Sequence, residues 1–262
     1  MLKIHSIAVS YGETEILHEV TLDVAAGEVV SLIGPNGAGK TTMMRAISGV
    51  IPLKSGSVHV NGEDLSTTPI AERARLLAVV PQARKLTPEY TAKQAIMMGR
   101  TPYLGWLGNP SQSDFDKVDW AIERTGISGL VDRRVDELSG GEQQLILVAR
   151  ALAQDAPVIL LDEPTAHLDL RHQATILDLV HDLARESSLA VLMSLHDLNL
   201  VSIFSDRIAL LDQGTILADG QPYDVLNRDM LSRVYQVPLD IIPHPHRDIP
   251  LVLLNGHEDE PG

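Results

Sequence analysis

Short apolar stretches recur along the chain, and segments with helical spacing follow several of them. The stretches are four to seven residues long, as in strands that are buried on both faces of a sheet, and they cover 28–33, 76–80, 158–161, 189–195 and 207–211. Helical patterns begin at Thr41, Leu170 and Leu198. This alternation of strand and helix predicts an α/β protein with a mainly parallel central sheet.

The segment between Gln82 and Ser139 shows helix and loop signals without a convincing strand, and we interpret it as a helical insertion. The end of the chain, which contains Pro243-His-Pro-His246, is rich in Pro, His and acidic residues and predicts an extended edge followed by a frayed tail. The expected division is a first part of the core over 1–82, a helical subdomain over 83–150, a second part of the core over 151–240 and a C-terminal edge and tail over 241–262.

Composition narrows the class of protein. The 262 residues carry 21 basic and 35 acidic side chains, a net charge of −14, and no cysteine. The negative charge argues against a nucleic-acid partner and against a polybasic attachment to lipid, and the lack of cysteine excludes disulfides and thiolate chemistry. No stretch approaches the roughly 20 apolar residues that span a bilayer. We therefore expect the chain to stay in the cytoplasm unless a partner holds it at a membrane.

The segment after the first predicted core strand carries a phosphate-binding motif. It matches GxxxxGK[ST] between a strand and a helix, the context that this motif needs. Backbone N–H groups of such a loop approach phosphate oxygens, Lys40 adds charge for the β- and γ-phosphates, and Thr41 offers a hydroxyl to Mg²⁺. A glycine-rich turn without a ligand is the alternative, but the flanking elements favour a nucleotide. The predicted binding residues are Gly34, Pro35, Asn36, Gly37, Ala38, Gly39, Lys40, Thr41 and Thr42.

Two acidic residues end the apolar run that begins at Val158. Asp162 and Glu163 come at the carboxyl end of a predicted parallel strand, where open α/β sheets bind their ligands. Asp162 is the predicted partner of Mg²⁺, and Glu163 is the predicted general base that activates water. The pair could instead begin a loop and cap the next helix.

The motif Leu138-Ser-Gly-Gly-Glu142 precedes the acidic strand. Ser139 and Glu142 have the spacing of a capping box, which does not require the two glycines between them. With this motif the sequence closely resembles the ABC-transporter ATPase family over about Leu2 to Asp240. The resemblance implies a P-loop NTPase (RecA-like) core with an N-terminal antiparallel β part and an inserted helical subdomain, and it implies hydrolysis of ATP with Mg²⁺.

The resemblance also implies roles for single residues. Tyr11 corresponds to the aromatic residue that stacks on adenine, although it could equally be a surface residue at a strand end. Gln82 corresponds to the glutamine that contacts Mg²⁺ and the attacking water and senses the transmembrane partner. Asp169 belongs to the D-loop, Ala166-His-Leu-Asp169. His196 corresponds to the switch histidine, with capping of the next helix beside Asp197 as the alternative.

In the resembling family the signature residues face the γ-phosphate that is bound to the other subunit. Ser139, Gly140 and Gly141 are the matching residues here. The resemblance therefore implies an ATP-dependent homodimer in which two copies complete each site.

Two further segments resemble the branch that energises import of iron siderophores, haem and corrinoids. They are Met98-Gly99-Arg100-Thr101-Pro102 and the run from Thr165 to Gln173. This implies integral membrane permease subunits, an indirect link to a substrate-binding protein, and a peripheral location on the cytoplasmic face of the cell membrane. The cargo is not encoded in this chain, because the ATPase does not touch it.

The nine aromatic residues are unevenly distributed, and a cluster of them lies in the expected insertion. We expect Phe115 and Trp120 to form its small core. Tyr103, Leu104, Trp106 and Leu107 lie in a loop bounded by Gly and Pro, which cannot bury all of them in a regular helix. In the resembling importers this region receives a short cytoplasmic helix of the permease, so the resemblance implies that these residues form a socket for it. The alternative for Trp106 is that it pins the loop to the insertion.

Other classes explain less of the sequence. ABC-type ATPases of DNA repair carry long coiled coils or cysteine zinc sites, and translation factors of this class join two such domains. A metabolic kinase would explain the loop at Lys40, but not the motif at Ser139 or the histidine at 196. A metal site at His244 and His246 lacks a third ligand at suitable spacing.

Overall fold

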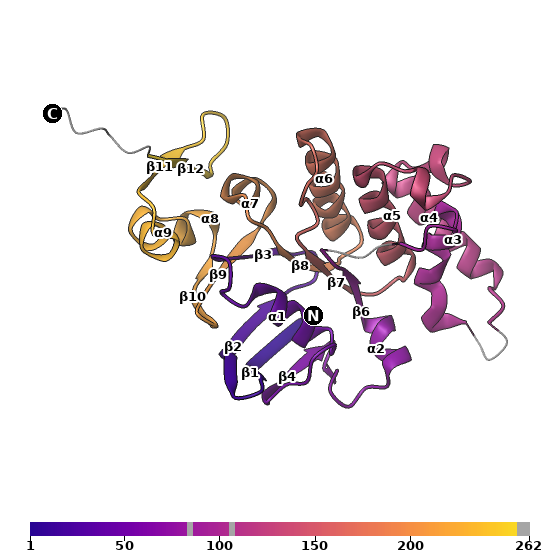
Figure 1. Ribbon diagram of the computed structural model, residues 1–262, viewed down its shortest axis with the longest axis horizontal. Helices are drawn as coiled ribbons and strands as arrows, with labels where there is room; N and C mark the ends of the chain where they lie inside the picture. The colour runs from indigo at the N-terminus through magenta and orange to yellow at the C-terminus, as the bar shows by residue number, and fades with distance from the viewer. Residues whose placement is uncertain (83–85, 105–107, 256–262) are drawn as a thin grey trace.

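A six-stranded sheet forms the centre of the molecule (Figure 1). This computed structural model describes residues 1–82, 86–104 and 108–255. The strand order is β10-β9-β3-β8-β7-β6, and all neighbours are parallel except β10 and β9. The five predicted strands are all present with ends within one residue of the prediction. The bounds are β3 (Val29–Ile33), β6 (Leu77–Val80), β7 (Val158–Asp162), β8 (Ala190–Ser194), β9 (Arg207–Asp212) and β10 (Thr215–Gly220).

The sheet separates two hydrophobic cores because successive side chains of each strand point to opposite faces. Leu160 and Leu192 belong to the core that faces the N-terminal sheet, whereas Leu161 and Met193 belong to the core under the large helices. The N-terminal sheet is antiparallel in the order β2-β1-β4-β5, and helix α1 lies between it and the central sheet (Figure 1). The bounds are β1 (Leu2–Tyr11), β2 (Thr14–Val24), α1 (Lys40–Ile47), β4 (Ser55–Val60) and β5 (Glu63–Asp64). The predicted fold class, including its antiparallel N-terminal part, is confirmed.

Helices cover the other face of the central sheet. Helix α6 lies above β7 and β8, and α5 stands beside it with the helical part of the chain (Figure 1). Between Gln82 and Ser139 the described residues form helices and one isolated bridge, as predicted. The bounds are α2 (Ile70–Leu76), α3 (Ala92–Met97), the 3₁₀ helices η1 (Met98–Tyr103), η2 (Ser128–Leu130) and η3 (Val135–Glu137), α4 (Gln112–Thr125), α5 (Gly140–Ala153), α6 (Leu170–Glu186) and α7 (Leu198–Phe204).

The aromatic residues of this helical part differ in how far they are buried. Trp120 packs against the main core, as expected. Phe115 is 40% exposed, so its placement in a small core is wrong. The buried face of α4 is formed instead by Val118, Ala121 and Ile122, which recur at helical spacing.

The end of the chain differs from the prediction. It forms two short helices and a separate antiparallel hairpin, in which β11 pairs with β12 and with no strand of the central sheet. The segment predicted as an extended edge is extended, but its two strands pair with each other. Apolar residues lie on both sides of the proline-rich turn and allow this pairing. The bounds are α8 (Pro222–Val225), α9 (Arg228–Tyr235), β11 (Leu239–Pro243) and β12 (Pro250–Leu254). The expected tail over 256–262 lies outside the described residues.

Candidate functional site

Four neighbouring strands of the central sheet bring the predicted site residues together. The phosphate loop follows β3, His196 follows β8, Glu163 follows β7, and Gln82 follows β6. These strands are adjacent and parallel in the order β3-β8-β7-β6, so their carboxyl ends meet at one edge. This is where open parallel sheets bind ligands. Residues far apart in the sequence therefore surround one cleft.

The phosphate loop is fixed by close backbone packing. A Cβ atom at Gly34 would lie 2.0 Å from the carbonyl oxygen of Leu211, and Gly39 has φ +110°, which favours glycine. Lys40 is 6% exposed and donates to the carbonyl oxygens of Gly34 at 2.6 Å and Pro35 at 3.0 Å. Burial lowers the pKa of Lys40, against the opposing effect of nearby Glu163 and Asp162. The ammonium group is thus held over the loop.

A cleft of about 310 Å³ opens above this loop. Lys40, Thr41 and Thr42 form its floor at the start of α1, whose N-terminus carries partial positive charge. Tyr11 is 47% exposed and lines the same cleft. An exposed aromatic ring beside a phosphate-binding loop can stack on a base. The residues lining the cleft are Tyr11, Ile16, Asn36, Gly37, Gly39, Lys40, Thr41, Thr42 and Glu163.

Glu163 lies between the side chains that come from the two neighbouring strands. Its carboxylate accepts a hydrogen bond from Nε2 of Gln82 and makes a second with Nε2 of His196. Its backbone has φ +51°, an uncommon conformation for glutamate. The backbone N–H of Glu163 donates to the hydroxyl of Ser194 at 2.9 Å. The structure therefore places the predicted base next to Gln82 and His196.

Asp162 is more deeply buried than Glu163. It is 7% exposed and accepts a hydrogen bond from the Ser194 hydroxyl at 2.8 Å, and Thr41 also hydrogen-bonds to it. Burial raises the pKa of the Asp162 carboxyl, although the hydrogen bond from Ser194 opposes the shift. A carboxylate and a hydroxyl side by side are oxygen donors of the kind that Mg²⁺ prefers. The residues present therefore fit the predicted ion.

The signature residues lie elsewhere in the chain. Ser139 caps α5 and forms a complete capping box with Glu142, so the local interpretation of this motif is confirmed. A Cβ at Gly141 would lie 2.5 Å from the ring of His172, which explains one of the two glycines by packing. His172 is itself hydrogen-bonded to Asp169 at 2.8 Å. None of these residues lines the cleft above Lys40.

Comparison with known proteins decides the family. The family model described as ABC transporter matches residues 17–166, which contain the phosphate loop, the capped signature helix and both acids of β7. The chain belongs to the ABC transporter family. As an ABC protein with this cleft it is an ATP-binding ATPase.

Individual relatives cover nearly the whole chain. The hemin import ATP-binding protein HmuV of Nocardia farcinica is 42% identical over 239 residues, which are 91% of this chain and 82% of the relative. The achromobactin transport ATP-binding protein CbrD of Dickeya dadantii is 36% identical over 252 residues, 96% of this chain and 94% of the relative.

Solved structures agree with the fold. An inward-facing structure of a putative metal-chelate type ABC transporter gives a TM-score of 0.85 at 24% identity and covers 97% of both chains. The dimeric structure of a bacterial ABC transporter cassette gives a TM-score of 0.74 at 28% identity and covers 84% of this chain and 98% of that one. The second structure shows that a cassette with this fold forms a dimer.

One residue of the ABC site was not identified from the sequence. Ser194 is fully buried, donates to Asp162, and accepts from the backbone of Glu163. The only sequence signal was a polar residue at the end of an apolar strand. From the end of β8, Ser194 is hydrogen-bonded both to Asp162 at the end of the neighbouring strand β7 and to Glu163 directly after it.

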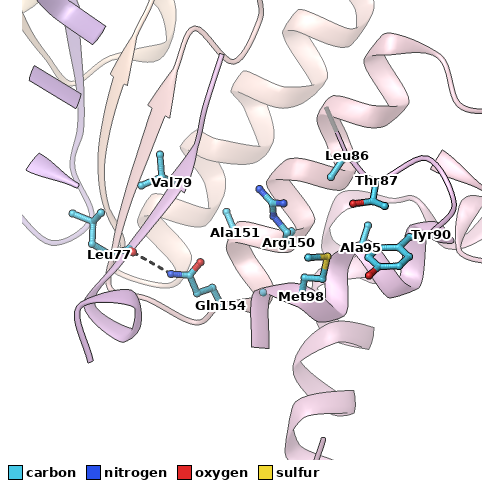
Figure 2. A pocket seen from close by; sticks show the side chains of 11 residues that line it. Leu77, Val79, Leu86, Thr87, Tyr90, Ala95, Met98, Arg150, Ala151 and Gln154 are labelled. Atoms are coloured by element: carbon cyan, nitrogen blue, oxygen red, sulfur yellow. Dashed lines mark hydrogen bonds between the residues drawn. The ribbon is translucent and has the colours of Figure 1, made fainter. Parts of the chain in front are cut away.

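A groove separates the edge of the central sheet from the helical part of the ABC chain (Figure 2). Its volume is about 480 Å³, and Figure 2 shows Leu77 and Val79 on one side and Tyr90, Ala95 and Met98 on the other. Met98 is 46% exposed and Tyr90 is 39% exposed. Two residues that line the groove, Val79 and Leu86, lie on either side of Gln82 in the sequence.

The ring of Tyr103, by contrast, lies over two guanidinium groups. Its centroid is 3.9 Å from the Arg100 guanidinium carbon and 5.1 Å from that of Arg75. Tyr103 is therefore engaged within the chain, which counts against its expected role as a socket residue. Trp106 and Leu107, the other main residues of that expectation, lie outside the described residues. None of the described helices is long and apolar enough to cross a membrane.

Proposed function

We propose that this chain is the ATP-hydrolysing subunit of an ABC importer that takes up haem or another iron chelate. The observation that carries the proposal is the position of Glu163, between Gln82 and His196 and at the rim of the phosphate cleft. The names of the relatives, hemin import and achromobactin transport, support an iron-chelate cargo. Corrinoid import remains the alternative within the same branch.

The proposed chemistry follows from the side chains around the cleft. Lys40 and the N-terminus of α1 bind the β- and γ-phosphates, and Tyr11 stacks on the adenine. Glu163 accepts a proton from the attacking water, while Gln82 and His196 orient its carboxylate through the hydrogen bonds that they already make. Breaking the bond to the γ-phosphate leaves ADP and phosphate.

Mg²⁺ would be held by Thr41 and Asp162, with Gln82 beside it, and would neutralise phosphate charge when bound. Asp162 would be ionised in that state, because the cation offsets the burial that raises its pKa. Ser194 keeps the carboxylate in place through the hydrogen bond at 2.8 Å. The chain thus provides a preformed oxygen site that contains a buried carboxylate.

We further propose that Ser139, Gly140 and Gly141 act on the nucleotide of a second copy, with Asp169 at the same interface. The support is that these residues do not line the cleft of their own chain and that a related cassette forms a dimer. Exposed N–H groups at the start of α5 would face the γ-phosphate of the partner.

The groove in Figure 2 is the proposed docking site for a cytoplasmic segment of the permease, which would hold the chain at the membrane. Exposed Met98 and Tyr90 offer apolar and aromatic contacts, and flexible methionine adapts to a partner surface. Met98→Lys should reduce co-purification with the permease encoded alongside by roughly 10-fold or more. Val50→Lys, at a residue that is 71% exposed elsewhere, is the matched control. Equal recovery of both variants would exclude the groove.

The decisive test of the function concerns Glu163. Glu163→Gln keeps the shape of the side chain and removes the base, so turnover of Mg-ATP should fall about 100-fold or more while binding persists. Phosphate release measures turnover, and calorimetry measures binding. Near-normal hydrolysis by the variant would refute the assignment of the base, and no binding of ATP by the wild type would refute the function.

A further inference from the structure

The switch histidine is followed directly by α7, and α7 is attached to the C-terminal hairpin. Asp197 caps the helix by accepting from the N–H groups of Asn199 at 2.8 Å and Leu200 at 3.1 Å. His196 precedes this capped turn and lies only three residues before Asn199 in the sequence. The cap residue Asp197 is thus bonded to the first turn of α7 directly after the histidine.

Asn199 forms a two-point clamp on the backbone of β12. Its side-chain nitrogen donates to the carbonyl oxygen of Val252 at 3.1 Å, and its side-chain oxygen accepts from the N–H of Val252 at 2.8 Å. One turn further along α7, the buried hydroxyl of Ser202 donates to the carbonyl oxygen of Pro250 at 2.7 Å. Residues three apart lie on the same face of a helix, so all three hydrogen bonds hold α7 against one strand.

The segment that carries His196 thus has two fixed ends. At one end Ser194, at the end of β8, donates to Asp162. At the other end Asn199 is clamped to Val252. Leu195 is 2% exposed between them, while His196 points outward to Glu163. Without the second anchor, the four-residue link between Ser194 and Asn199 would lose the nearest hydrogen bonds that hold its α7 end to β12.

The C-terminal part of the chain also contacts the phosphate loop. Burial raises the pKa of the hydroxyl of Tyr235, the last residue of α9, to about 12, and an interaction with the backbone of Gly34 opposes the shift. Helix α9 in turn contacts β11, the other strand of the hairpin. The C-terminal part of the chain is therefore in contact with the start of the phosphate loop and with the helix that follows His196.

We propose that the hairpin of β11 and β12 positions the switch histidine through the Asn199 clamp, and that Asn199 is a positioning residue for ATP hydrolysis. This rests on the proposed function, in which His196 orients Glu163. The apolar contacts of Val252 and Leu239 with the main core attach the hairpin to the body of the protein. The two hydrogen bonds of the amide then transmit that fixed position to α7.

The test compares Asn199→Ala with Ile242→Ser in the full chain. Ile242 is on the hairpin and 41% exposed, so its replacement leaves the clamp intact. We expect Asn199→Ala to lower kcat by about 3- to 10-fold, with KM for Mg-ATP changed less than about twofold, because orientation is lost and phosphate binding is kept. Ile242→Ser should keep the wild-type kcat. Asn199→Asp retains the acceptor for the Val252 N–H and should give an intermediate kcat.

Two further measurements separate positioning from loss of stability. Hydrogen exchange of the nucleotide-free chain should speed up in 195–204 and 250–254 of Asn199→Ala, and not in α1 or α5. Adding Asn199→Ala to His196→Ala should not lower kcat further, because the positioned group is gone. An additional loss in the double variant, or a wild-type kcat in Asn199→Ala, would overturn the inference. Full turnover by His196→Ala alone would instead refute the proposed role of the histidine.

Discussion

A buried ion pair in the helical part of the chain should make a large contribution to stability. Arg100 is 4% exposed and Asp114 is 5% exposed, and Nε of Arg100 donates to Oδ1 of Asp114 at 2.8 Å. Nη1 of Arg100 also donates to the carbonyl oxygen of Ala153 at 2.8 Å. One guanidinium group therefore joins η1 to the start of α4 and the end of α5.

Arg100→Met keeps an extended side chain and removes the charge. It leaves Asp114 without its cation and the Ala153 carbonyl without this donor. Removing one partner of a buried pair costs about 3–5 kcal/mol. Ser111 still donates to Asp114 from its N–H at 2.8 Å and its hydroxyl at 2.7 Å, so we expect the lower end, about 3 kcal/mol. For a chain of this size the melting temperature should fall by about 6–12 °C.

Thermal unfolding followed by circular dichroism measures the change. The matched control is Lys93→Met, which removes an exposed ion pair with Asp119 in the same region and should cost less than about 1 kcal/mol. Adding Asp114→Asn to Arg100→Met should recover part of the loss, because it neutralises the stranded carboxylate. If the melting temperature of Arg100→Met falls no further than that of Lys93→Met, the reasoning about burial is refuted.

The pH dependence gives an independent check. Hydrogen bonds from Ser111, and after them the contribution of Arg100, hold the pKa of Asp114 below its ordinary value of 3.8. A lowered carboxyl pKa stabilises the fold above the unfolded value, and the effect is lost as the pH falls through the folded value. The difference between wild type and Arg100→Met should therefore stay constant from about pH 8 to about pH 5.

Two further predictions concern the nucleotide cleft. Lys40→Ala should abolish measurable ATP binding in calorimetry, because the net charge of −14 opposes a polyanion and Lys40 supplies the local cation; an unchanged dissociation constant would show that the loop backbone suffices. Ser139→Arg should abolish hydrolysis in the pure protein, whereas mixing it with Lys40→Ala subunits should restore one site with both faces intact. Normal turnover by pure Ser139→Arg would exclude a shared site.

Much of the fold follows from strand burial. The strands of the central sheet are buried on both faces and appear in the sequence as apolar runs, so their ends were predicted within one residue. The C-terminal hairpin was harder to predict. The turn at Pro243 and His244 dominates the local composition, while the pairing of Ile241 with Val252 depends on contacts between separate segments.

The positions of the site residues were easier to predict than the contacts around them. Glu163 and His196 follow neighbouring strands that the apolar runs identify, so their approach follows from the strand order. The clamp of Asn199 on Val252 could not, because nothing in a sequence shows which backbone group an amide reaches. The segment around Gly99 and Arg100 was interpreted through its resemblance to a branch of importers. In the structure both residues have packing roles: a Cβ at Gly99 would lie 2.2 Å from the carbonyl oxygen of Arg150, and Arg100 forms the buried pair.

The backbone of Glu163 explains why one buried hydroxyl is important to the whole site. A glutamate at φ +51° is strained by roughly 1 kcal/mol or more, and glycine would relieve that strain. Glycine would also remove the carboxylate that contacts Gln82 and His196. The strained turn is stabilised by Ser194, which accepts from the N–H of Glu163 through its hydroxyl at 2.9 Å and through its carbonyl oxygen at 3.2 Å. Because the same hydroxyl also donates to Asp162 and the same residue begins the link to His196, the two acids and the histidine share one fixed point in the core.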